Sequence, residues 1–185
     1  MGTILEAIDH GDLDGFERSL LELPEAQRLE ALYALPGNRL KKIWDLAAGR
    51  SVSVDVLIPA VESPIRYRGR NSMPLFDKMS KVFWRSKEGA TFGYNDQFWS
   101  AFTGPGYFVA HEIDGSIAFD YTALPDKAPA GWPPITKPLF PIGTITFGNM
   151  IDHARWATKE SVIGHATRVN GRSRGVWFLM TRVSS

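Results

Sequence analysis

The chain contains no cysteine, and this absence excludes several classes of protein. Without thiols it can form no disulfide framework, thiolate metal cluster, iron–sulfur centre or cysteine nucleophile. No stretch approaches the ~20 apolar residues that a membrane helix requires. The first residues lack the basic and apolar regions of a signal peptide. We therefore expect a cytoplasmic protein with no membrane partner.

Common signatures of catalysis and phosphate binding are missing as well. The sequence has no G-x-G-x-x-G, no Walker loop, no G-x-S-x-G and no H-E-x-x-H. Its four histidines have neither the i, i+4 spacing of a helical zinc site nor the alternation of a metal site on a strand. We expect no metal and no cofactor, and the sequence leaves open whether the protein is an enzyme.

What is present is the composition of a folded protein. The 185 residues are 44% hydrophobic and 22% charged, both ordinary values for a globular chain. The length suits one domain. We predict a single domain over 1–185, with a helical segment over 1–50 and a β-rich body over 51–185.

The first fifty residues have helical periodicity. Apolar side chains recur at helical spacing in four short runs between residues 4 and 48. Asp12 suits the cap of the second helix, Pro24 the start of the third, and Gly49 the end of the fourth. Because each apolar stripe is short and one-sided, the helices should pack against a larger body.

From Ser51 onward the period changes to two, which is typical of strands. We predict strands at 51–59, 65–70, 107–113, 116–122, 142–151, 161–169 and 175–183, and a helix over 75–85. Asp114-Gly115 and Asn170-Gly171 suit hairpin turns. The proline-rich stretch 125–141 should be a long ordered loop.

About seven to nine sequential strands must bury one face of their sheet. They can do so by closing into a barrel or by wrapping around a helix. We predict an α+β fold in which an antiparallel, mostly meandering sheet closes into a barrel capped by the N-terminal helices. A cone-shaped sheet around a helix is the alternative.

Aromatic residues are concentrated in 92–108, where seven of seventeen residues are aromatic. Apolar walls with a few placed polar groups are how a ligand pocket is built, although a solid aromatic core would give the same pattern. His111 and His165 share strand faces with apolar residues, so we expect both to point inward. The candidate ligand-binding residues here are Tyr94, Asn95, Trp99, Tyr107, His165 and Trp177.

Charged groups offer a second set of candidates. His111 or Asp96 could serve as the acid–base group of an enzyme. Arg66, Arg68 and Arg70 alternate along one predicted strand, so their side chains share a face that could clamp an anion. Nucleic acid is not expected there, because no aromatic residues are interleaved on that face.

In outline, residues 90–185 resemble the calycin group, meaning lipocalin-like and fatty-acid-binding-like barrels. The resemblance is architectural and implies a barrel with its ligand site inside. The stretches 93–97 and 103–109 also resemble motif text of an uncharacterised bacterial family, which carries no activity with it.

Three functions stay open at this point. The first is a barrel that binds a small apolar or aromatic molecule, and it requires a hollow interior. The second is a cofactor-independent isomerase, cyclase or lyase on the same barrel, which requires an inward titratable group with a shifted pKa. The third is a protein-interaction module with a solid core.

Overall fold

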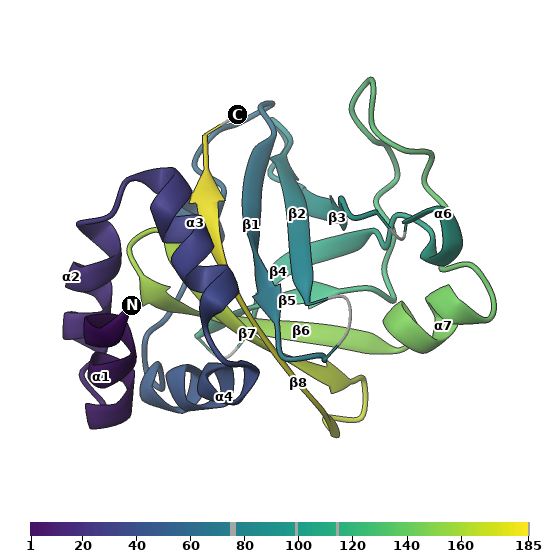
Figure 1. Cartoon of the computed structure of the whole chain (residues 1–185). Coiled ribbons are helices and arrows are strands. Elements are labelled where there is room, and N and C mark those ends of the chain that lie inside the picture. The colour runs from purple at the N-terminus through teal and green to yellow at the C-terminus, as the bar shows by residue number, and fades with distance from the viewer. Residues whose placement is uncertain (75–76, 99, 114, 185) are drawn as a thin grey trace.

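A computed structural model of the protein describes residues 1–74, 77–98, 100–113 and 115–184. Within this part of the chain, eight strands form a closed barrel in which each strand is antiparallel to the next and β8 returns to β1 (Figure 1). The prediction of an α+β fold with a meander that closes into a barrel is confirmed. The strands are β1 (Ile65–Asn71), β2 (Lys78–Arg85), β3 (Thr91–Asn95), β4 (Phe108–Ile113), β5 (Ser116–Asp120), β6 (Met150–Thr158), β7 (Ser161–Arg168) and β8 (Ser173–Val183).

Four helices make up the N-terminal segment, as predicted: α1 (Gly2–His10), α2 (Leu13–Leu21), α3 (Glu25–Ala34) and α4 (Gly37–Leu46). The Asp12 side chain accepts a hydrogen bond from the Gly15 amide and so caps α2. The helices lie against the outer wall formed by β6, β7, β8 and β1 (Figure 1). Their apolar stripes and the outward side chains Ile163 and Leu179 make one core layer outside the barrel. The helices are therefore a buttress on the wall and do not cap an end.

The predicted strand at 51–59 is wrong. Residues 54–57 form a one-turn helix, α5 (Val54–Leu57), and the adjacent Leu57 and Ile58 are both buried in the barrel core. The Tyr67 hydroxyl, inside the barrel, donates to the Leu57 carbonyl oxygen at 3.0 Å. Because the eight strands close on themselves, the barrel offers no edge for another strand, and this segment plugs one end instead.

Two further sequence predictions need correction. Residues 78–85 form β2, paired to β1 and β3, so the predicted helix over 75–85 is wrong there; residues 75 and 76 lie outside the described part. The predicted strand at 142–151 is also wrong over its first half, which is α7 (Ile142–Phe147). Short apolar runs of this kind fit either period, and pairing partners decide between them.

The two hairpins and the loop were predicted well. β4 pairs with β5, and β7 with β8, although Asp114 lies outside the described residues. Residues 125–141 contain no helix or strand. The short helices α6 (Ser100–Thr103) and α7 lie together at the end of the barrel away from the α5 plug (Figure 1). The interior thus has a plugged end and an end bordered by short helices.

Candidate functional site

A cavity of about 610 Å³ occupies the barrel interior at the end bordered by α6 and α7. Its walls are mostly apolar and come from inward-facing positions of the strands and from the two short helices. They include Met79, Phe147, Met150, Ala166, Val176 and Phe178. The interior below it, toward the α5 plug, is filled by packed side chains such as Phe83, Ile117 and Met180.

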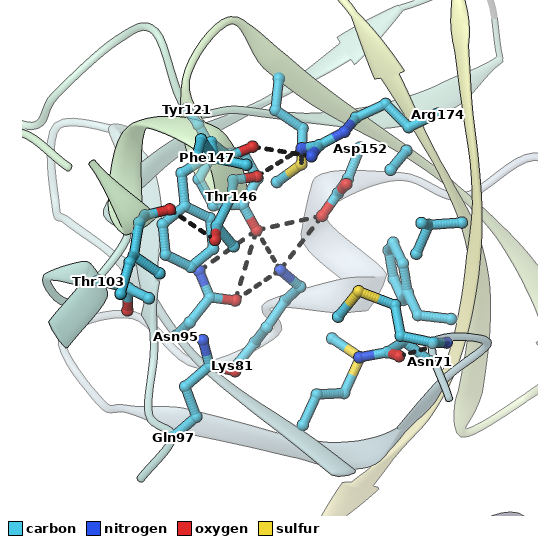
Figure 2. Close-up of a pocket in the computed structure, with 18 of the residues that line it drawn as sticks. Asn71, Lys81, Asn95, Gln97, Thr103, Tyr121, Thr146, Phe147, Asp152 and Arg174 are labelled. Carbon is cyan, nitrogen blue, oxygen red and sulfur yellow. Dashed lines mark hydrogen bonds and ion pairs between the residues drawn. The ribbon is translucent and has the colours of Figure 1, made fainter. Parts of the chain in front are cut away.

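Four buried polar side chains meet at one side of this cavity: Lys81 on β2, Asn95 on β3, Tyr121 directly after β5, and Asp152 on β6 (Figure 2). The Lys81 Nζ donates to the Asn95 Oδ1 at 2.8 Å and to the Tyr121 hydroxyl oxygen. It also lies 3.3 Å from the Asp152 Oδ2. The Tyr121 hydroxyl donates to the same carboxylate oxygen at 3.1 Å. We call these four residues the polar cluster.

Aromatic rings and a backbone carbonyl group hold the polar cluster in place. Phe108, Phe119 and Phe178 surround the ammonium of Lys81, whose Nζ lies 5.0, 5.6 and 5.4 Å from their ring centroids. Such distances allow cation–π attraction. The Asn95 amide nitrogen donates to the Gly106 carbonyl oxygen at 2.8 Å, which fixes the amide so that its oxygen faces Lys81. A side chain at Gly106 would strike this amide and Phe147, and its φ of +56° favours glycine.

Burial shifts the titration of the cluster. It lowers the pKa of the Lys81 ammonium, and the neighbouring Asp152 carboxylate opposes that shift. It raises the pKa of the Tyr121 hydroxyl well above its ordinary value, and Asp152 adds to the effect. The Lys81 and Asp152 side chains are only 2% and 5% exposed, so water screens their interaction little. The cluster therefore combines a buried amine, a hydroxyl and a carboxylate within hydrogen-bonding distance of one another.

The open end is crossed by α7, and an arginine on β8 holds it there. The Arg174 guanidinium donates to the Ile145 carbonyl oxygen at 2.9 Å and to the Thr146 carbonyl oxygen (Figure 2). On the other side of α7, Gly143 packs so tightly that an added Cβ would lie 2.1 Å from the Thr103 carbonyl oxygen of α6. These contacts join α7 to both α6 and the barrel wall.

Exposed apolar side chains border the opening. Phe102, Ile142 and Ile145 line the cavity and are also exposed to solvent, so the cavity reaches the surface beside α6 and α7. Nearby in the chain, Phe98 and Phe140 are 84% and 87% exposed. Large apolar groups gathered at one place on a surface often mark a ligand or partner site.

Among the candidate ligand-binding residues that the structure describes, Asn95 alone lines the cavity. Tyr94 and Tyr107 lie on the outside of the barrel, where both contact Trp132 of the proline-rich loop. The Tyr107 hydroxyl donates to the Pro133 carbonyl oxygen at 2.6 Å. The aromatic residues of 92–108 therefore have different places: Phe108 packs in the barrel core, Tyr94 and Tyr107 contact the loop, and Phe102 lines the cavity. Trp99 lies outside the described residues.

The predicted inward orientation of both histidines is wrong. His111 is exposed on β4, because Phe108 and Ala110 take the inward positions. His165 faces outward from β7 and packs between Trp44 of α4 and Trp177 of β8. Sequence alternation could not choose the face here, because the buttress helices and the proline-rich loop make parts of both faces apolar.

The charged candidates lie together on the outer surface. Arg66 forms an ion pair with Asp96 and donates to the Ser80 Oγ at 3.2 Å. Arg68 is exposed on the same face of β1, as the alternation predicted. Arg70 donates to the Tyr33 carbonyl oxygen at 2.9 Å and pairs with Asp77. These groups are outside the cavity and separate from the polar cluster.

Three members of the polar cluster were not among the sequence candidates. Lys81 lies between Met79 and Phe83 on one face of β2. Asp152 lies between Met150 and Ala154 on one face of β6. Each is therefore a single charged residue on an otherwise apolar strand face. That pattern was a usable signal for Asp152. It was hidden for Lys81 because 78–85 was assigned to a helix. Tyr121 follows β5 directly and lies in the barrel core with Ile117 and Phe119.

Among the described residues, no three histidine, aspartate or glutamate side chains are grouped so that they could hold a metal ion. None of the helices in the described part is both long and apolar enough to cross a membrane. Comparisons with protein-family models, with curated proteins and with solved structures found no match.

Proposed function

We propose that this protein binds a small, predominantly apolar molecule inside its barrel, as lipocalin-like proteins do. The observation that carries the proposal is the cavity of about 610 Å³, which falls within the roughly 300–1,000 Å³ of typical small-molecule sites. A solid core, which the protein-interaction alternative requires, would leave no such volume.

The position of the polar cluster suggests how the ligand would be oriented. Its apolar part would lie against Met79, Phe147 and Phe178, where removal from water stabilises the complex by about 25 cal/mol per Å² of apolar area. A polar end group would face Lys81 and Tyr121. Access would be through the opening beside α6 and α7, over the exposed apolar side chains Phe102, Ile142 and Ile145.

One observation favours the second candidate function, a cofactor-independent enzyme. The cavity holds an inward amine and hydroxyl whose pKa values burial shifts in opposite directions. Groups of this kind are common at catalytic sites. Lys81, Tyr121 and Asp152 would then act in place of the candidates His111 and Asp96.

Binding can be tested with the uncharged fluorescent probe N-phenyl-1-naphthylamine. We expect saturable 1:1 binding with a blue-shifted emission, and loss of binding in Val176→Trp, which places an indole in the cavity. The matched control is Phe140→Ser, which removes an exposed ring that does not line the cavity and should leave binding unchanged. Binding that survives Val176→Trp but is lost in Phe140→Ser would contradict an interior site.

A further inference from the structure

Lys81 is the one primary amine among the described residues that line the cavity. Its Nζ is reached from the cavity and not from bulk solvent, since the side chain is 2% exposed. Lysines on the protein surface, in contrast, are hydrated ammonium ions, which react poorly as nucleophiles at neutral pH. A sequestered amine in an apolar chamber is a different chemical group.

We propose that the cavity takes an apolar aldehyde or ketone and holds it as an imine on the Nζ of Lys81. This inference rests on the proposed function and narrows it to carbonyl compounds. It assigns the polar cluster to the formation and stabilisation of one covalent bond.

The surroundings of Lys81 suit the product as well as the free lysine. A protonated imine keeps its positive charge on the same nitrogen, so the Asp152 carboxylate, 3.3 Å away, remains its counter-ion. The rings of Phe108, Phe119 and Phe178 lie within 5.6 Å of that nitrogen and attract either cation. The apolar walls limit the water that would hydrolyse the imine.

The cluster also contains the groups that the reaction needs. A proton first passes from the Lys81 ammonium to the Asp152 carboxylate, a transfer favoured by the burial that lowers the pKa of Lys81. The free amine then attacks the carbonyl carbon, and the carbonyl π bond becomes an oxyanion. The Tyr121 hydroxyl is hydrogen-bonded to both Lys81 and Asp152. It relays a proton from the Lys81 nitrogen to the oxyanion, which gives a neutral carbinolamine.

The last step releases water. Asp152 returns its proton to the carbinolamine oxygen, the carbon–oxygen bond breaks, and the nitrogen lone pair forms the carbon–nitrogen double bond. The balance is one carbonyl compound and one lysine ammonium giving one protonated imine and one water. No oxidant or reductant is needed, and Asp152 ends as the carboxylate it was at the start.

The test uses 2-naphthaldehyde with sodium cyanoborohydride, which reduces an imine to a stable secondary amine. Peptide mass spectrometry of the whole protein should show Lys81 modified about tenfold or more faster than exposed lysines such as Lys159, because the cavity concentrates the aldehyde beside the amine. Excess 2-naphthylmethanol, which has the same ring system but no carbonyl, should protect Lys81 and leave Lys159 labelling unchanged.

The outcomes separate this inference from the proposed function. If 2-naphthylmethanol displaces N-phenyl-1-naphthylamine but Lys81 is labelled no faster than Lys159, the imine is overturned and the binding function stands. If neither N-phenyl-1-naphthylamine nor 2-naphthylmethanol binds and Lys81 is not labelled preferentially, the imine and the binding function are both overturned. In the double variant Lys81→Met/Asp152→Leu, which removes both charges, only the slow labelling of exposed lysines such as Lys159 should remain, and fast labelling that persists there would overturn the imine at Lys81.

Discussion

At the scale of single residues, the unusual feature is a salt bridge inside an apolar barrel. Removing two charges from water costs several kcal/mol per ion, and the pair offsets this only where its geometry is good and its remaining bonds are satisfied. Here Asn95 and Tyr121 supply those bonds to Lys81. A protein that needed only a stable core would gain by apolar residues at these positions, so the cluster is better explained by binding or chemistry.

The first prediction tests this coupling. Lys81→Met leaves the Asp152 carboxylate buried without its cation and should lower the free energy of unfolding by about 3–5 kcal/mol. The double variant Lys81→Met/Asp152→Leu removes both charges and should recover most of that loss. Urea unfolding of the three proteins measures the difference. Equal stability of the single variant and the unsubstituted protein would show that the pair is not buried as described.

A second residue-scale prediction concerns the plugged end. Burial raises the pKa of Tyr67 from 10.0 to about 12, so the folded protein binds its phenolic proton more tightly than the unfolded chain. Stability from this group is therefore complete below pH 10 and is lost as pH rises toward 12, at about 1.4 kcal/mol per pH unit.

The Tyr67→Phe variant lacks that proton. At pH 7 it should be about 1 kcal/mol less stable, because the bond to the Leu57 carbonyl is gone. Above pH 10 the unsubstituted protein should lose stability faster than the variant, so the two curves converge and then cross before pH 12. Denaturant unfolding at several pH values provides the comparison, and parallel curves up to pH 12 would contradict the burial of this hydroxyl.

At the scale of elements, α7 borders the opening, and Arg174 attaches it to the barrel. Arg174→Ala removes the bonds to the Ile145 and Thr146 carbonyls. Hydrogen bonds to a charged donor contribute about 1.5–3 kcal/mol, so local opening of α7 should become at least roughly tenfold more frequent. Hydrogen exchange of residues 142–147 and the dissociation rate of N-phenyl-1-naphthylamine should both rise.

The matched control for this variant is Arg172→Ala, which removes an exposed arginine from the same hairpin. Exchange over 142–147 should not change there. If both variants behave like the unsubstituted protein, α7 is held by its packing alone and Arg174 is not its attachment.

The elements also show what sequence could predict. The N-terminal helices and the hairpins were predictable because period, capping residues and turn residues agree locally, as Asp12 shows for α2. The plug at α5 and the strand β2 were not, since both depend on closure of the barrel. Closure uses every strand edge, so the valines near 54 pair with no strand, whereas Lys81 and Phe83 each have a partner on both β1 and β3.

The same cause limited the prediction of the site. Asn95 was found because it lies in the aromatic stretch, but Lys81 and Asp152 come from strands that meet only across the barrel interior. A single sequence does not encode which strands face each other in a barrel of unknown register. The inward prediction for the two histidines was wrong for a complementary reason. The buttress helices make the outer face of β7 apolar beside His165, and Tyr107, on the face of His111, packs outside the barrel against Trp132 of the loop.

At the scale of the whole molecule, the barrel has two unlike halves. The half next to the α5 plug is packed with side chains, among them Ala154, which is fully buried. The half next to α6 and α7 holds the cavity, and Ala166 lies on its wall. The two alanines occupy inward positions on the adjacent strands β6 and β7. The same substitution at each therefore compares the free space in the two halves of the barrel.

The most direct test of a hollow interior is therefore the thermal stability and probe binding of Ala166→Phe beside Ala154→Phe. Added bulk in a packed core costs about 1–3 kcal/mol, whereas a cavity accommodates it. We expect Ala166→Phe to unfold near the temperature of the unsubstituted protein and to lose binding of N-phenyl-1-naphthylamine, and Ala154→Phe to be destabilised. Equal destabilisation of the two variants, with no effect of Ala166→Phe on binding, would contradict the account.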